Sequence, residues 1–136
     1  MTNGERADRL VAEARQIAGE MNRALDGQAW NLATRRAQEV LELVIKALLN
    51  EMGVDYPKTY DPAPVFAQAV RMRGINVDAG VLDSLTALSQ ELAKVRGPAF
   101  YQETVVTASQ ARAWVQRVGH ALQFGEDLLR RLRKAP

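Results

Sequence analysis

The segment from 96 to 103, with the sequence RGPAFYQE, holds the residues best suited to chemistry. Arg96 is expected where a helix ends, and its planar guanidinium matches the geometry of phosphate oxygens. Phe100 and Tyr101 follow, and an aromatic ring beside a positive charge offers a stacking surface for a nucleobase. Structural roles stay open: an arginine complements the partial negative charge of a helix C-terminus, and Tyr101 is expected as a packed ring whose hydroxyl meets solvent.

Lys46 is a second candidate, because it lies in the most apolar part of a predicted helix. Glu42 precedes it by four residues, which is the favourable order for an ion pair on a helix. This ion pair is the preferred interpretation, and the alternative is an anchor for a phosphate or nucleotide. Further polar residues on this helix predict a solvated face, with a subunit interface or polar cleft as the alternative: Arg35, Arg36, Gln38, Glu39 and Glu42.

His120 is the only histidine, and histidine is the side chain that titrates near neutral pH without perturbation. It has no nucleophile or carboxylate beside it at a recognised spacing, so a partly exposed residue without a catalytic role is the preferred interpretation. The chain ends with a basic cluster that alternates with leucines and predicts the solvated face of a terminal helix, with binding of nucleic acid or an acidic partner as the alternative. The cluster comprises Arg130, Arg131, Arg133 and Lys134.

Composition limits the classes of function. The 136 residues are enough for one domain, 1–136, and the 47% that are hydrophobic are enough for a packed core. The 18 basic and 16 acidic residues give a net charge of only +2, which does not indicate a nucleic-acid or membrane protein. Without cysteine and with one histidine, neither a metal centre nor a cofactor is expected. No signal-peptide core or membrane-spanning run is seen, so a cytoplasmic protein is expected.

Apolar residues recur every three to four positions along most of the chain, which is the spacing of amphipathic helices. These stripes predict a first helix that ends at Asp26-Gly27, and later helices over about 28–52, 61–74, 78–95 and from 107 onward. The second helix is apolar over so much of its circumference that it is expected at the centre. The prediction is an all-α, up-and-down bundle of four long helices and one short helix.

Local signals set the expected helix ends. The first helix is capped by Thr2 or Asn3, the third by Asp61 with Pro62, and the last by a capping box in Thr107–Gln110. Two glycine signals are expected to end the second and fourth helices: Gly53 and Gly97-Pro98.

Three segments together resemble the HEPN domain family, the helical domains named for higher eukaryotes and prokaryotes nucleotide binding. Segment 32–49, LATRRAQEVLELVIKALL, is similar to the family's second helix in its Ala-Gln-Glu run and its Lys-Ala-Leu-Leu ending. Segment 53–61, GVDYPKTYD, is similar to the family's loop with Gly, Pro and Thr-His-Asp. Segment 96–101, RGPAFY, stands in the position of the motif between the last two long helices.

The resemblance implies a helical bundle that commonly dimerises through its motif-bearing helices. Many members are metal-independent ribonucleases, often toxins paired with a small nucleotidyltransferase. Their motif is an arginine followed after four to six residues by a histidine, which moves the proton of the RNA 2′-hydroxyl while the arginine stabilises charge on the phosphate. Arg96 matches this arginine, but Tyr101 stands where the histidine is expected and Tyr60 replaces the histidine of the loop. A phenol with a pKa of roughly 10 is a poor base at neutral pH.

The first interpretation is therefore a HEPN-like, homodimeric protein that binds a nucleotide, RNA or a partner protein. It would be the toxin-type component of a pair with a small nucleotidyltransferase. Its candidate binding residues are Arg96, Tyr101, Lys46 and Tyr60. One alternative is a ribonuclease with an altered catalytic set of Arg96 and Tyr101, with His120 as a further candidate. The other alternative is a purely structural interaction domain.

Overall fold

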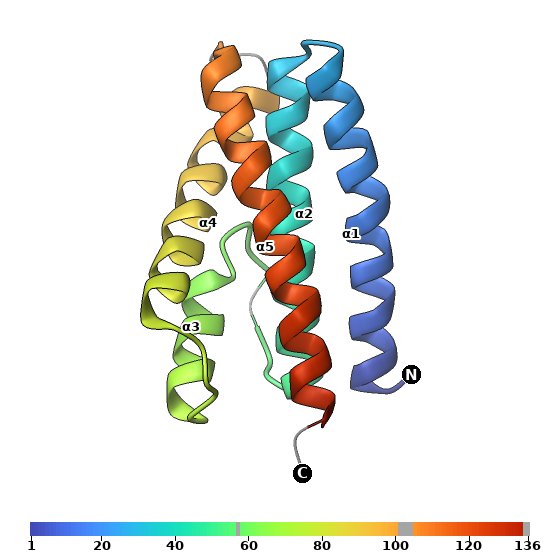
Figure 1. The fold of residues 1–136 in the computed structure, drawn as a ribbon, viewed down its shortest axis with the longest axis vertical. Helices are drawn as coiled ribbons and strands as arrows, with labels where there is room; N and C mark the ends of the chain where they lie inside the picture. The colour runs from blue at the N-terminus through green and yellow to red at the C-terminus, as the bar shows by residue number, and fades with distance from the viewer. Residues whose placement is uncertain (57, 101–104, 135–136) are drawn as a thin grey trace.

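The fold is an all-α bundle in which four long helices run alternately up and down (Figure 1). The computed structural model describes residues 1–56, 58–100 and 105–134, without the side chains of 98–100. Within these ranges no strand is formed, which confirms the predicted fold class. The helices are α1 (Asn3–Asp26), α2 (Trp30–Met52), the short α3 (Ala63–Met72), α4 (Ala79–Phe100) and α5 (Ala108–Lys134).

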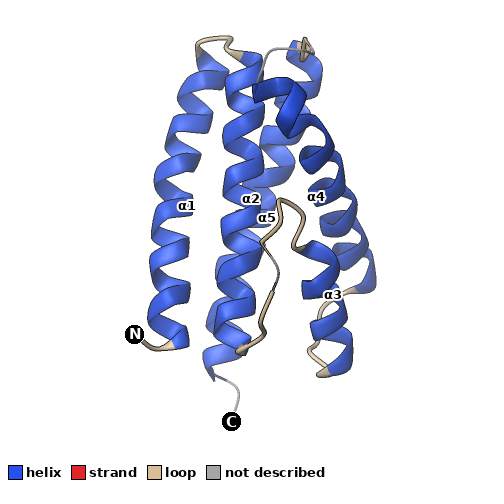
Figure 2. Cartoon of the chain, turned by 180° about the vertical axis from the view of Figure 1, so that it is seen from behind, coloured by secondary structure: helices blue, strands red, loops and turns tan. Residues whose placement is uncertain are grey.

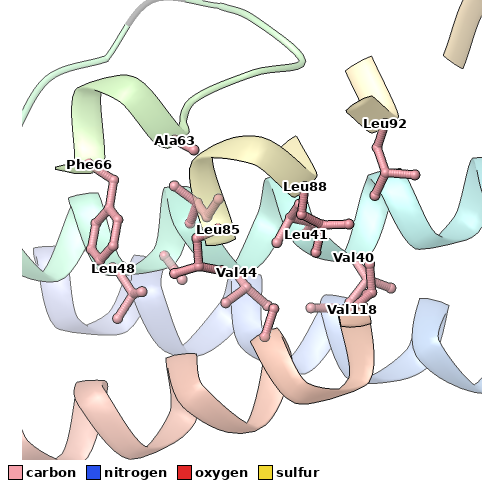
Figure 3. Packing of buried hydrophobic residues seen from close by; sticks show 14 of the residues in the cluster. Val40, Leu41, Val44, Leu48, Ala63, Phe66, Leu85, Leu88, Leu92 and Val118 are labelled. Atoms are coloured by element: carbon pink, nitrogen blue, oxygen red, sulfur yellow. The ribbon is translucent and has the colours of Figure 1, made fainter. Parts of the chain in front are cut away.

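Helix α2 lies at the centre of the bundle, as its broad apolar surface predicted. It packs against α1, α5, α4 and α3, and the side chains of the last three helices converge on it in Figure 3. Burying a Leu, Val or Ile side chain fully contributes about 1.5–3 kcal/mol each, so this helix supplies much of the core energy. Its fully buried aliphatic residues are Val40, Leu41, Val44, Ile45, Leu48 and Leu49.

Most of the predicted helix ends are confirmed. The side chain of Thr2 accepts a hydrogen bond from the backbone N–H of Glu5 at 3.1 Å. Thr107 and Gln110 form a reciprocal capping box, because each side chain accepts from the other's backbone N–H, at 3.1 and 3.0 Å. Gly53 ends α2 in the left-handed conformation, with a φ of 69°, where a side chain would be strained.

The predicted cap at Asp61 is wrong. Pro62 occupies the cap position of α3 without a side-chain hydrogen bond. Asp61 instead accepts a hydrogen bond from the Ser89 hydroxyl of α4 at 2.5 Å. The Asp61 carboxylate is therefore oriented toward α4, and this tertiary contact takes the place of the predicted cap.

The predicted end of the fourth helix is also wrong, because α4 continues through Gly97-Pro98 to Phe100. A proline within a helix loses its own N–H bond and crowds the preceding residue. Gly97 has no Cβ, which relieves part of that crowding. Arg96 therefore lies inside the last turns of a helix and not in a loop.

The basic C-terminus is paired within the fold, which favours the structural interpretation of that cluster. Arg133 donates to Glu51 of α2 at 2.7 Å and lies 2.8 Å from Asp8 of α1, so it joins three helices. The hydrogen bonds with Glu51 raise the pKa of Arg133 above its ordinary value. Arg130 pairs with Asp127, and Arg131 donates to the backbone carbonyl of Asn76 at 3.1 Å.

Candidate functional site

Polar side chains form a row along one side of α2, in the otherwise apolar centre of the bundle. They recur every fourth residue, so they lie one above the next on a single helix face. The segment between α2 and α3 runs along α2 beside them, and α4 lies on the other side of that segment (Figure 2). The row comprises Gln38, Glu42, Lys46 and Asn50.

Gln38 is the hub of this row, although only 2% of it is exposed. Its amide nitrogen donates to Glu42 at 2.9 Å and to the backbone carbonyl of Tyr60 at 3.1 Å. Its amide oxygen accepts from Arg96 of α4 at 2.6 Å. Because each amide group has a partner, the side chain is held in one orientation with its oxygen toward the arginine.

Arg96 is held by neutral groups. Its guanidinium carbon lies 4.3 Å from the centre of the Tyr60 ring, a cation–π contact, and one of its nitrogens donates to Gln38. Among the residues that the structure describes, no carboxylate forms an ion pair with Arg96. The guanidinium is partly buried, so its positive charge is placed and oriented, and no acidic side chain in the described ranges neutralises it.

Lys46 differs from Arg96, because its charge is paired. Its amine lies 2.7 Å from Glu42, which confirms the predicted ion pair. The same amine lies 5.7 Å from the centre of the Tyr56 ring, and the Tyr56 hydroxyl accepts from Asn50 at 3.1 Å. Lys46 is therefore part of the same polar row, with its charge balanced by its neighbour.

Tyr60 sits at the surface of the site with 54% of it exposed. The hydrogen bond from Ser89 to Asp61 fixes the segment that carries it, and the backbone N–H of Asp61 donates to Thr59 at 3.1 Å. A shallow depression lies beside the ring, lined by Glu42, Lys46, Lys58, Thr59 and Tyr60. The ring thus covers Arg96 on one side and leaves aromatic surface open to a ligand.

Three of the four predicted site residues are therefore brought together: Arg96, Lys46 and Tyr60 belong to one connected polar network. Tyr101 lies outside the described residues. His120 is exposed on α5, where it lines a groove with α4, and it shares no hydrogen bond or ion pair with Arg96. Among the described residues, His120 therefore makes no hydrogen bond or ion pair with this network.

Gln38 does not lie on the solvated face that the sequence favours, and its burial fits the alternative of a polar cleft. Its four-residue spacing from Glu42, and that of Glu42 from Lys46, was a usable signal for one shared face. Nothing local indicated its burial, because Arg96 and Tyr60 reach it from 58 and 22 residues away.

The protein is a small up-and-down helical bundle with an arginine near the end of its fourth helix. Among the described residues, this arginine has no carboxylate partner. The family model for the HEPN domain matches residues 7–128, and the chain belongs to this family. No curated protein and no solved structure matches the chain significantly. Over the part of the chain that the structure describes, no helix is long and apolar enough to cross a membrane, and no three His, Asp or Glu side chains gather as metal ligands.

Proposed function

We propose that this protein binds a nucleotide or single-stranded RNA through Arg96, with the Tyr60 ring beside the bound phosphate. Membership of the HEPN family supports a nucleotide- or RNA-related function. The observation that carries the finer proposal is the environment of Arg96. Its partners among the described residues are an amide oxygen and a ring, and neither neutralises its charge.

The donor count of the guanidinium favours an anionic ligand. Arginine has five N–H donors in a rigid fork, and Gln38 accepts from one of its nitrogens. The others suit phosphate oxygens, and a charge-assisted bond to phosphate is about twice as strong as a neutral one. The exposed part of Tyr60 suits a base, because stacking on an aromatic ring contributes about 1–3 kcal/mol per base.

Lys46 and Tyr101 have different places in the proposal. A phosphate at Lys46 would have to compete with Glu42, so we place this residue second to Arg96. Tyr101 stays a prediction from the sequence, five residues beyond Arg96. We further propose a cytoplasmic homodimer in which two Arg96 sites line one polar cleft, and a pairing as the toxin-type component with a small nucleotidyltransferase.

A thermal-shift experiment tests the binding site. A ligand at about 100 times its Kd adds about 2.7 kcal/mol to the stability, which raises the Tm of a domain of this size by roughly 8 °C. Short single-stranded RNA, ATP and GTP are the probes. We expect one of them to raise the Tm of the wild-type protein and Arg96→Ala to erase the rise. Arg130→Ala removes the same charge from an exposed ion pair on α5 and should keep the shift. If none of the probes shifts the Tm, the interaction-domain alternative is favoured.

The finer parts of the proposal have separate tests. Sedimentation at high protein concentration should give a dimer, and a monomer there would contradict the shared cleft. A reading frame for a small nucleotidyltransferase beside this one would support the pairing.

RNA from the binding experiment should stay intact without metal. Cleavage that Arg96→Ala abolishes would instead establish the ribonuclease alternative.

A further inference from the structure

A groove of about 470 Å³ lies between α4 and α5, and Arg96 is not among its lining residues. The two helices lie close at one end of the bundle and diverge toward the other, as Figure 1 shows. The α4 wall is built from residues at the spacing of one helix face: Val81, Ser84, Leu85 and Leu88. From the first to the last of these, the wall spans two helical turns, or about 10 Å.

Small side chains keep the groove open. Ser84 of α4 and Ala121 of α5 line its middle, while the larger Leu85, Leu88 and Phe124 form apolar walls around them. Val81 remains 37% exposed at the rim. A ligand pocket typically has a volume of about 300–1,000 Å³ and mostly apolar walls, and this groove satisfies both conditions.

The α5 side of the groove carries two side chains that can donate hydrogen bonds. Arg117 and His120 lie three residues apart on α5, and His120 has no hydrogen bond or ion pair among the described residues. Glu91 accepts from two nitrogens of Arg117 at 3.2 Å, and these hydrogen bonds lower the pKa of Glu91. They fix the guanidinium and balance its charge, so Arg117 offers a ligand its remaining N–H donors rather than an unpaired charge. Among the described lining residues Asp78 is the only carboxylate, and it accepts from the backbone N–H of Val81 at 3.2 Å, at the end of the groove away from Arg117.

We propose that this groove binds a small molecule with an apolar body, two fused rings or a medium-length chain, and one anionic head. The body would lie along Leu85, Leu88 and Phe124, and a carboxylate or sulfonate would accept hydrogen bonds from Arg117 and His120. This site is independent of the function proposed for Arg96, which does not line the groove.

Two related dyes test the proposal. Anilinonaphthalene sulfonate has the required body and head, and phenylnaphthylamine has the same rings without the sulfonate. The wild-type protein should bind one sulfonate dye per chain, with a rise in fluorescence, more tightly than the neutral dye. Arg117→Gln with His120→Gln should weaken the sulfonate dye at least tenfold, because the loss of even one charge-assisted hydrogen bond has about that effect, and should leave the neutral dye unchanged. Equal binding of both dyes, or no effect of the double variant, would overturn the proposal.

A substitution that fills the groove tests whether the dye binds there. Ser84 is exposed, so Ser84→Phe should fold and occupy the groove, and it should reduce binding of both dyes at least tenfold. Ala87→Phe adds the same ring to an exposed position of α4 outside the groove and should bind as the wild type does. Amide chemical shifts of wild-type α4 and α5 during titration give the location without mutation, and shifts confined to other helices would refute it. Arg96→Ala should keep dye binding, which separates this site from the proposed nucleotide site.

Discussion

Gly125→Ala is expected to destabilise the protein by roughly 2–3 kcal/mol, because overpacking a well-ordered core forces backbone or side-chain shifts. A Cβ at position 125 would lie 2.3 Å from Cγ1 of Val44 and 3.9 Å from Cδ1 of Leu48. Val44 and Leu48 belong to the buried face of α2, so neither can turn into solvent. Urea denaturation followed by circular dichroism measures the loss.

Gly119 supplies the matched control on the same helix. A Cβ there would meet nothing within 4 Å, and alanine is favoured over glycine in a helix interior by about 0.8–1.0 kcal/mol. Gly119→Ala should therefore stabilise the protein. Adding Val44→Ala to Gly125→Ala should recover part of the loss, because the clashing methyl groups are removed. Equal stabilities of the two glycine variants would show that α5 and α2 do not approach as closely as described.

Gln38→Leu is the second change with a large expected effect. Leucine has a similar volume but leaves Arg96, Glu42 and the Tyr60 carbonyl without the amide that joins them. Leaving buried polar groups unsatisfied costs about 1–3 kcal/mol, so we expect a loss of about 2 kcal/mol in the free energy of unfolding. The ligand-induced rise in Tm should shrink without vanishing, because Arg96 remains but is no longer oriented.

Gln90→Leu is the control for this change, because it makes the same substitution at an exposed position of α4. It should leave both the unfolding free energy and the ligand-induced shift close to wild type. If Gln38→Leu were as stable as Gln90→Leu, the amide would not be the hub of the network.

The sequence predicted the features of the fold that depend on neighbours along the chain. Apolar periodicity gave five helices, and short-range signals gave the caps at Thr2, Gly53 and Thr107. The end of α4 differs from the prediction, because the Gly97-Pro98 turn signal does not indicate that the glycine can accommodate the proline within the helix. Local rules state how often such a pair ends a helix, and they do not state what the last turns pack against.

In the candidate site, too, contacts within one helix were predictable from the sequence and contacts between helices were not. The ion pair of Lys46 with Glu42 was predictable, because both residues lie on one helix four positions apart. The contact of Arg96 with Gln38 was not, because it depends on how α4 packs against α2. The same holds for Ser89 and Asp61, which fix the segment that carries Tyr60. The family resemblance identified Arg96 and Tyr60 as candidates but not the amide that joins them.

The close approach at Gly125 also determines which parts of the molecule can move. With no side chain to act as a spacer at Gly125, sliding of α5 along α2 would bring larger residues against Val44, so we expect these two helices to move as one unit. Helix α4 lines the groove and also contacts the Tyr60 segment through Ser89 and Arg96, and both the groove and the depression beside Tyr60 are open to solvent. Motion linked to ligand binding should therefore occur in α4 and that segment. Amide hydrogen exchange should be slowest where α2 faces α5, and faster exchange there than in α4 would contradict this division.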